Sequence, residues 1–179
     1  PRVTPTGPNS RPNACTLCHL DRTLQWTAEH LTSWHQHPPV TLGETDRKVA
    51  AALNWLLAGD AAQRAITAWH FGWKPALEEA GTDWIPLRIA PALDDPYPAV
   101  RFITWQSLKS LPGLAPFSYE FDGATRERQE SIQAIGRSWR PPRKITAPEL
   151  LSTEDGTLDQ VRLQQLQESR DNRGVEIYE

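Results

Sequence analysis

The residue types best suited to chemistry lie near the start of the chain, where Cys15, Cys18 and His19 form a Cys-x-x-Cys-His run. Two thiols three positions apart can add to the two vinyl groups along one edge of a porphyrin. The imidazole that directly follows can then lie under the iron and supply a nitrogen ligand. The 2 cysteines of the chain both belong to this run. The spacing therefore predicts one covalent haem c, with Cys15 and Cys18 as thioether sites and His19 as an iron ligand.

A disulfide, a zinc site and an accidental pattern are the alternatives to haem at this run. A Cys15–Cys18 disulfide would close a very small loop, and such bonds are usually redox-active within a βαβ unit that this sequence lacks. A zinc site would add His30 and His35, whose spacing is close to that of a two-Cys, two-His finger. A finger also needs a hairpin to carry its cysteines, whereas residues 13–19 lead straight into a helical pattern. Haem is therefore the favoured interpretation.

The ligand on the other side of the iron has no motif of its own. The chain contains no Met, which excludes the His/Met pair of many small cytochromes. Among the other histidines, His70 is the first candidate because Trp69 and Trp73 flank it, and His37 and His30 follow. His30 lies about 16 Å beyond His19 along a straight helix. A histidine from a partner chain is the remaining alternative.

Composition and motifs exclude several classes of function. The 179 residues (20.2 kDa) carry 19 Lys and Arg against 22 Asp and Glu, without the basic excess of an electrostatic nucleic-acid binder. No apolar run reaches the roughly eighteen residues of a membrane span, so no transmembrane segment is expected. Known catalytic motifs are lacking, and the pairs Glu78-Glu79 and Asp94-Asp95 do not share a helix face, so we expect no enzymatic activity. A chain that starts at Pro1 is expected to be processed or cut from a longer polypeptide.

Hydrophobic periodicity predicts an all-α fold in three parts. Residues 1–40 are expected to form an extended arm, a Cys-containing turn, and a helix from about Leu20 to the Pro38-Pro39 break. Residues 41–122 are expected to form short helices, and residues 123–179 to form peripheral C-terminal helices. No segment alternates with period two, so no sheet is expected. The expected helices of the last two parts cover about 45–58, 60–71, 75–80, 83–93, 97–111, 124–139 and 158–170.

The 8 tryptophans and one acidic pair are expected to have structural roles. The tryptophans lie mostly at core-like positions of the predicted helices, which favours a packing role over one in electron tunnelling. Asp95 precedes Pro96 and is expected to cap the helix that follows, so we assign Asp94 and Asp95 to capping.

Two segments resemble known families. Residues 93–101 (LDDPYPAVR), followed by Leu108 and Leu111, resemble a HEAT-type repeat, in which an Asp-Pro turn precedes a helix with a Val-Arg pair. Residues 11–26 (RPNACTLCHLDRTLQW) resemble the terminal haem motif of certain bacterial c-type cytochromes. Those are multihaem proteins in which Cys-x-x-Cys-His motifs are joined to HEAT-like or tetratricopeptide repeats. This chain departs from them by carrying a single haem motif.

The resemblance to these cytochromes implies a function. It implies electron transfer through one haem c, with His19 as the proximal ligand, in a subunit or module of a larger redox assembly. Its partners would be other redox proteins or haem-bearing subunits. Thioether formation in this family also implies export, and hence an extracytoplasmic (periplasmic or cell-surface) location. The alternative is a HEAT-like protein-interaction module with a structural haem or zinc at the Cys/His turn.

Overall fold

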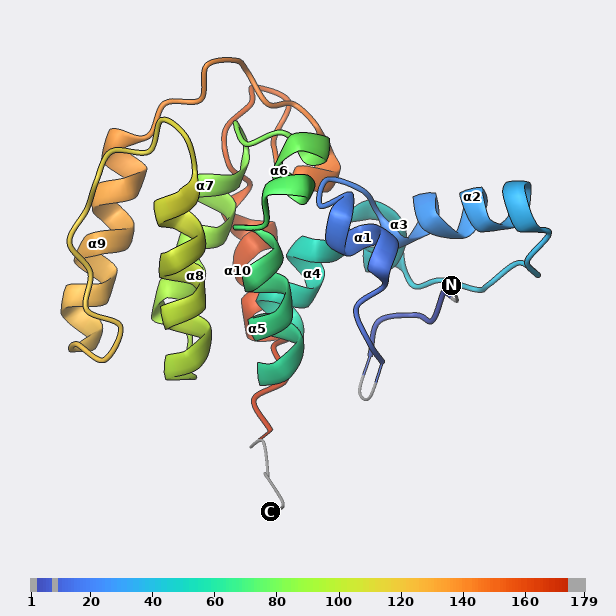
Figure 1. Cartoon of the computed structure of the whole chain (residues 1–179), viewed down its shortest axis with the longest axis horizontal. Helices are drawn as coiled ribbons and strands as arrows, with labels where there is room; N and C mark the ends of the chain where they lie inside the picture. Colours follow the sequence, from blue (N-terminus) through green and yellow to red (C-terminus); the bar gives the residue numbers. More distant parts are fainter. Residues whose placement is uncertain (1–2, 8–9, 174–179) are drawn as a thin grey trace.

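Helices form nearly all the regular structure of this computed structural model, which describes residues 3–7 and 10–173 (Figure 1). Within these residues the extended pairings are two isolated bridges, Thr23 with Ala50 and Ser152 with Leu158. The prediction of an all-α fold is therefore confirmed, while predictions that fall on residues 1–2, 8–9 and 174–179 lie outside the described residues. The elements are α1 (Ala14–Cys18), α2 (Leu24–His35), α3 (Glu44–Lys48), α4 (Ala51–Ala58), α5 (Ala61–His70), α6 (Lys74–Ala80), α7 (Ile85–Ile89), η1 (Ala90–Asp94), α8 (Pro98–Ser110), α9 (Thr125–Ser138), η2 (Pro148–Leu150) and α10 (Gln160–Glu168).

The Cys-containing segment and the helix after it differ from their prediction. The cysteines lie on a separate short helix, α1, and α2 begins only at Leu24 instead of Leu20. The side chain of Thr23 caps α2 by accepting a hydrogen bond from the Trp26 amide at 3.1 Å. This cap fixes the start of α2 and leaves residues 19–22 outside both helices.

The helix expected over about 45–58 is broken in two, because distant segments pair with the backbone at the break. The Ala50 amide donates to the Glu149 carbonyl, and the Ala51 amide donates to the Arg22 carbonyl, both at 2.8 Å. Further along the chain local signals hold: Asp60 caps α5 in a reciprocal pair with Gln63. Nothing in the local sequence predicts these tertiary hydrogen bonds, whereas a helix cap can be predicted from the residues around it.

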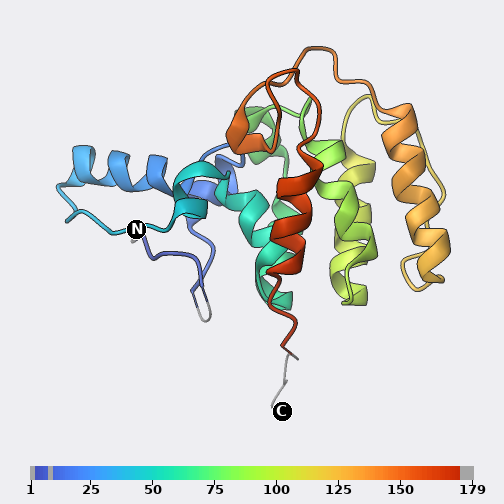
Figure 2. The same cartoon turned by 180° about the vertical axis from the view of Figure 1, so that it is seen from behind.

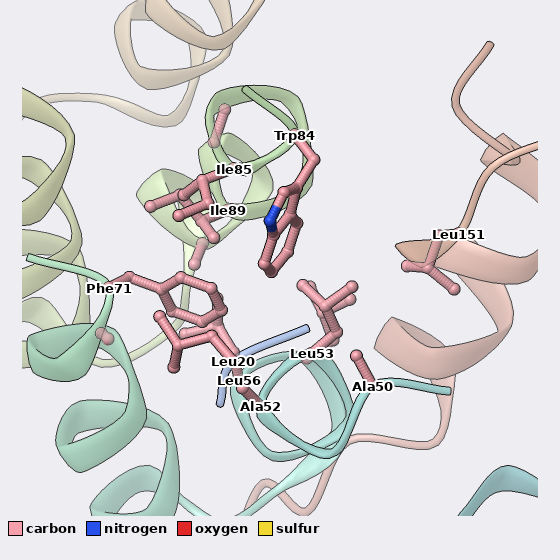
Figure 3. Packing of buried hydrophobic residues seen from close by; sticks show 14 of the residues in the cluster. Leu20, Ala50, Ala52, Leu53, Leu56, Phe71, Trp84, Ile85, Ile89 and Leu151 are labelled. Carbon is pink, nitrogen blue, oxygen red and sulfur yellow. The ribbon is translucent and has the colours of Figure 1, made fainter. Parts of the chain in front are cut away.

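One main hydrophobic core joins all three predicted parts of the chain. Leu20, directly after the Cys-x-x-Cys-His run, is fully buried in this core (Figure 3). Helix α5 packs against α4 and α8, and α10 packs against α4. The segment after residue 122, which was expected to be peripheral, thus also contributes side chains to the core. Its residues in the core are Ile135, Ile145, Leu150, Leu151, Leu163 and Leu166.

The helices form an elongated row with α2 at one end. In both views α5, α8 and α9 lie side by side, whereas α2 projects away from them at the opposite end from α9 (Figures 1 and 2). Helix α2 has its own smaller apolar cluster, in which Leu24 and Leu31 pack with Val3, Leu42 and Trp55. Helix α1 lies where this projecting part meets the row of helices (Figure 1).

The expectation that the tryptophans lie in the core is wrong for three of them. Trp34, Trp69 and Trp73 expose 65%, 53% and 38% of their surface, whereas Trp55 and Trp84 are buried. The exposed indoles lie on α2 and around the end of α5, on faces that this chain does not cover.

The expectation that Asp94 and Asp95 serve as helix caps is also wrong. Asp95 does accept a hydrogen bond from the Tyr97 amide at 2.8 Å, but its carboxylate is buried against Arg64, with Oδ2 2.8 Å from Nε. Asp94 pairs instead with Arg128 of α9 at 2.8 Å. Both carboxylates therefore join separate segments. The N-cap of α8 is Tyr97, without a side-chain capping bond, so the bond from Asp95 shapes the turn before the helix and does not cap it.

Candidate functional site

The candidate site starts with the single helical turn that carries both cysteines. Asn13 caps α1 by accepting a hydrogen bond from the Cys15 amide at 2.9 Å, and its carbonyl accepts one from the Thr16 hydroxyl at 3.0 Å. The His19 amide closes the turn on the Cys15 carbonyl at 2.8 Å. Cys15 and Cys18 are three positions apart on this turn, both as free, partly exposed thiols. The two cysteines are therefore only partly buried, and they are not joined as a disulfide.

Two buried side chains hold this turn against the body of the molecule. Thr16 and Leu20 are both fully buried, and Leu20 belongs to the cluster that also contains Phe71 and Leu56 (Figure 3). Helix α1 packs mainly against α6 and also touches α2. The thiols and the His19 ring are thereby carried by a backbone that the hydrophobic core fixes in place.

His19 lies between a carboxylate and an indole ring. Its Nδ1 atom is 3.1 Å from Oε1 of Glu79, at the end of α6, and its ring centroid is 4.8 Å from that of Trp26. The contact is an ion pair without the geometry of a hydrogen bond, but a negative carboxylate beside Nδ1 favours the tautomer whose proton lies on that nitrogen. In this tautomer the lone pair is on Nε2, which is the arrangement that a metal-ligating imidazole requires.

The contacts of His19 continue along α2 as a row of alternating rings. The His30 ring lies 4.3 Å from Trp26 and 4.7 Å from Trp34, measured between centroids. The Nδ1 atom of His30 is 2.8 Å from the Trp26 carbonyl, which places its proton there and leaves Nε2 as an acceptor. One indole thus separates two imidazoles that both offer a nitrogen lone pair.

The structure does not bring all the predicted iron ligands together. His70 has its described ring contacts with Trp69 and Trp73, and its Nδ1 atom lies 2.8 Å from the Ile66 carbonyl. The ring contact of His37 is with His35, at 6.4 Å between centroids. Of the three distal candidates, His30 is the one that shares a row of ring contacts with His19.

A second carboxyl group modifies the charge around His19. Burial raises the pKa of Asp21, and this effect outweighs the neighbouring Arg22 guanidinium, which lowers that pKa. The Arg22 Nε atom lies 3.3 Å from Asp21, and the guanidinium carbon is 5.8 Å from the Trp26 ring centroid. The surroundings of His19 therefore contain acidic and basic groups in close contact, without a strong excess of either sign.

The zinc alternative lacks an assembled set of donors. Among the described residues, no three His, Cys, Asp or Glu side chains form a group that could hold a metal ion. The haem alternative needs a different set, namely two free thiols on one turn and one imidazole whose Nε2 is available, and Cys15, Cys18 and His19 meet this requirement. The donor chemistry of the run thus fits a covalent haem c.

Glu79 is the residue of this site that the sequence did not reveal. In the sequence Glu79 is only half of an adjacent acidic pair, and it lies sixty positions after His19 with no spacing rule to join them. Trp26 belongs to the family-like motif, but nothing in that motif indicates its contact with the His19 ring. Both contacts arise from the packing of α1 against α6 and α2.

No family model, curated protein or solved structure matches the chain. Among the residues that the structure describes, no helix combines the length and apolar character needed to cross a bilayer.

Proposed function

We propose that this chain is an electron-transfer protein, which belongs with the c-type cytochromes and carries one haem c attached to Cys15 and Cys18. The observation that carries the proposal is the arrangement at α1: two free thiols lie on one helical turn, and a buried anchor, Leu20, follows the adjacent His19. A bound haem supplies an iron that accepts and releases one electron at a time. No catalytic role is proposed for the chain by itself.

The chain's own residues would hold this group and control its surroundings. Cys15 and Cys18 would form the two thioether bonds, and His19 would supply the proximal nitrogen through Nε2. Trp26 would pack beside the His19 imidazole and restrict its orientation, given the 4.8 Å between their ring centroids. Because both thiols are partly exposed, the attached edge would lie near the surface, where a redox partner can approach.

The setting of the protein is part of the proposal. Without Met, iron ligation by two histidines places the reduction potential below that of a His/Met cytochrome. The family resemblance supports a role as a module of a larger redox assembly, with HEAT-like helices beside other haem-bearing subunits or redox proteins. It also supports an extracytoplasmic location, where haem attachment takes place.

Absorption spectroscopy tests the proposal. The chain would be produced in a periplasm that attaches haem to Cys-x-x-Cys-His motifs, purified, and reduced with dithionite. We expect a Soret band, a low-spin six-coordinate spectrum, and complete reduction by dithionite. A colourless protein with stoichiometric zinc would contradict the proposal, and so would a coloured protein that dithionite does not reduce.

A second candidate function, the protein-interaction module, is favoured by a specific surface. Ile66 and Trp69 of α5, Trp73, and Phe102 of α8 each expose more than a third of their surface. Trp69 and Phe102 line one shallow groove together with Ile103 and Gln106. In this alternative the groove is the functional surface and the Cys/His turn is structural, so the purified protein would bind its partner without any redox-active group.

A further inference from the structure

One charged contact of the site is not needed for haem attachment, and it concerns the nitrogen of His19 that faces away from the iron. Nδ1 of His19 lies 3.1 Å from Oε1 of Glu79, with 31% of the His19 side chain and 55% of the Glu79 side chain exposed. An imidazole can offer Nε2 to a metal only while its proton lies on Nδ1. A negative carboxylate 3.1 Å from Nδ1 favours that tautomer through its charge.

The position of Glu79 follows from the packing of α6. Ala76 of this helix is fully buried, and the helix ends at Gly81, whose φ of 71° is a conformation that suits glycine. The neighbouring carboxylate, Glu78, pairs with Lys74 one turn earlier at 3.6 Å. Glu79 instead pairs with His19, so the two adjacent carboxylates have different partners.

We infer that Glu79 is a positioning residue for the iron ligand and lowers the reduction potential of the haem, an inference that rests on the proposed function. A carboxylate close to Nδ1–H polarises the imidazole and makes it a stronger electron donor through Nε2. Stronger donation and the nearby negative charge both stabilise the ferric state relative to the ferrous state, and the surroundings of an iron ligand are one of the ways in which a protein sets this potential. Glu79 would thus act through His19 without touching the iron.

Potentiometric titration of the haem-loaded full chain tests this role. Glu79→Gln keeps an oxygen acceptor at nearly the same place but removes the charge, and Glu78→Gln removes the same charge from the adjacent position on α6. We expect Glu79→Gln to weaken the preference for ferric over ferrous iron about tenfold, which is a rise of about 59 mV for one electron. Glu78→Gln should change the potential far less. Equal shifts in the two variants, or no shift in either, would overturn the inference.

A second measurement does not depend on haem. Nitrogen-15 NMR of the full chain with free thiols, at a pH where imidazole is neutral, reports which nitrogen of His19 carries the proton. We expect the Nδ1–H tautomer in the parent chain and a mixture richer in Nε2–H in Glu79→Ala, with Glu78→Ala unchanged. A tautomer that does not respond to Glu79→Ala would overturn the inference. If instead the tautomer responds but no haem is ever attached, the proposed function fails while the contact itself stands.

Discussion

At the scale of single residues, the chemistry of the site depends on which groups lie beside the Nδ1 atom of each imidazole and on whether its Nε2 atom can bind a metal. In His30 and His70 the Nδ1 atom has a hydrogen-bond acceptor, the carbonyl four residues earlier, whereas in His19 it faces the Glu79 carboxylate in an ion pair. His30 and His70 therefore each offer Nε2 for ligation. The choice of distal ligand between them depends on how the rings lie around the bound group.

The distal ligand can be identified by single substitutions in the haem-loaded protein. We predict that His30→Ala converts the iron from low-spin to high-spin, because His30 shares the row of ring contacts with His19 and a lost axial ligand leaves a five-coordinate centre. His70→Ala and His37→Ala are the matched variants, and a spectrum that changes in one of these instead would reject His30. If none of the three variants changes the spin state, a partner chain supplies the ligand.

A buried phenol outside the site gives a pH-dependent prediction. The Tyr119 hydroxyl donates a hydrogen bond to the Leu93 carbonyl at 2.5 Å, and burial raises the pKa of Tyr119 to about 12. Because the folded-state pKa lies above the unfolded value of about 10, this group's contribution to stability is complete below pH 10. It is lost as the pH rises from about 10 to about 12.

Absorbance at alkaline pH measures this ionisation directly. We expect one phenol to titrate near pH 12 in the parent chain and to be absent from the titration of Tyr119→Phe. The same variant leaves the Leu93 carbonyl without its donor and should lose about 1–2 kcal/mol of unfolding free energy at neutral pH. A parent chain in which every phenol titrates near pH 10 would contradict the prediction.

The residues of the Cys-x-x-Cys-His run could be found from the sequence, because their chemistry depends on spacing along the chain. Glu79 and the ion pair of Asp95 could not, since each depends on two segments that meet only after folding. The position of Asp95 next to Pro96 predicts a helix cap, and nothing in the sequence around it indicates the ion pair with Arg64. The distal ligand stays a prediction for the same reason.

At the scale of elements, one buried ion pair joins three segments. Arg64 of α5 and Asp95, just before α8, each expose 1% of their side chains. The Nη2 atom of Arg64 donates to Oδ1 at 3.2 Å, while Nε lies 2.8 Å from Oδ2 at an angle that makes it an ionic contact and not a hydrogen bond. Arg170, after α10, reaches the same carboxylate at 3.5 Å, so the pair links the C-terminal segment to the α5–α8 contact.

Removing the charge of Asp95 should therefore destabilise the fold strongly. Asp95→Asn keeps the shape of the side chain but leaves the Arg64 guanidinium buried without its counter-charge, which costs about 3–5 kcal/mol. Asp94→Asn is the matched control, because it removes the more exposed pair with Arg128 and should cost roughly 1 kcal/mol or less. Urea unfolding measures both losses. Similar losses of unfolding free energy in the two variants would contradict the prediction, because burial would then not make the Asp95 pair the more important of the two.

Element boundaries were predictable wherever local chemistry decides them. Asp60 caps α5, Gly81 ends α6, and the proline pair at 38–39 follows the end of α2, all as the sequence indicates. The break between α3 and α4 was missed because the amides of Ala50 and Ala51 bond to Glu149 and Arg22, far away in sequence. Long-range backbone pairing of this kind overrides helical periodicity.

At the scale of the whole molecule, the candidate site lies between a packed row of helices and the projecting helix α2 (Figure 1). The main core extends from Leu20 to Leu166, so the segment after residue 122 helps to hold the same core that anchors the Cys/His turn. Helix α2 carries His30 and the exposed Trp34 away from this body (Figure 1). A group attached at α1 would therefore have the core on one side and the ring row of α2 on the other.

The mass of the intact, denatured protein tests the central claim most directly. Produced where haem attachment takes place, the parent chain should exceed its polypeptide mass of 20.2 kDa by one haem, because thioether bonds survive denaturation. Cys15→Ser/Cys18→Ser should show the polypeptide mass alone, with unchanged circular dichroism as the control for folding. A parent chain that weighs no more than its amino acids would contradict the account.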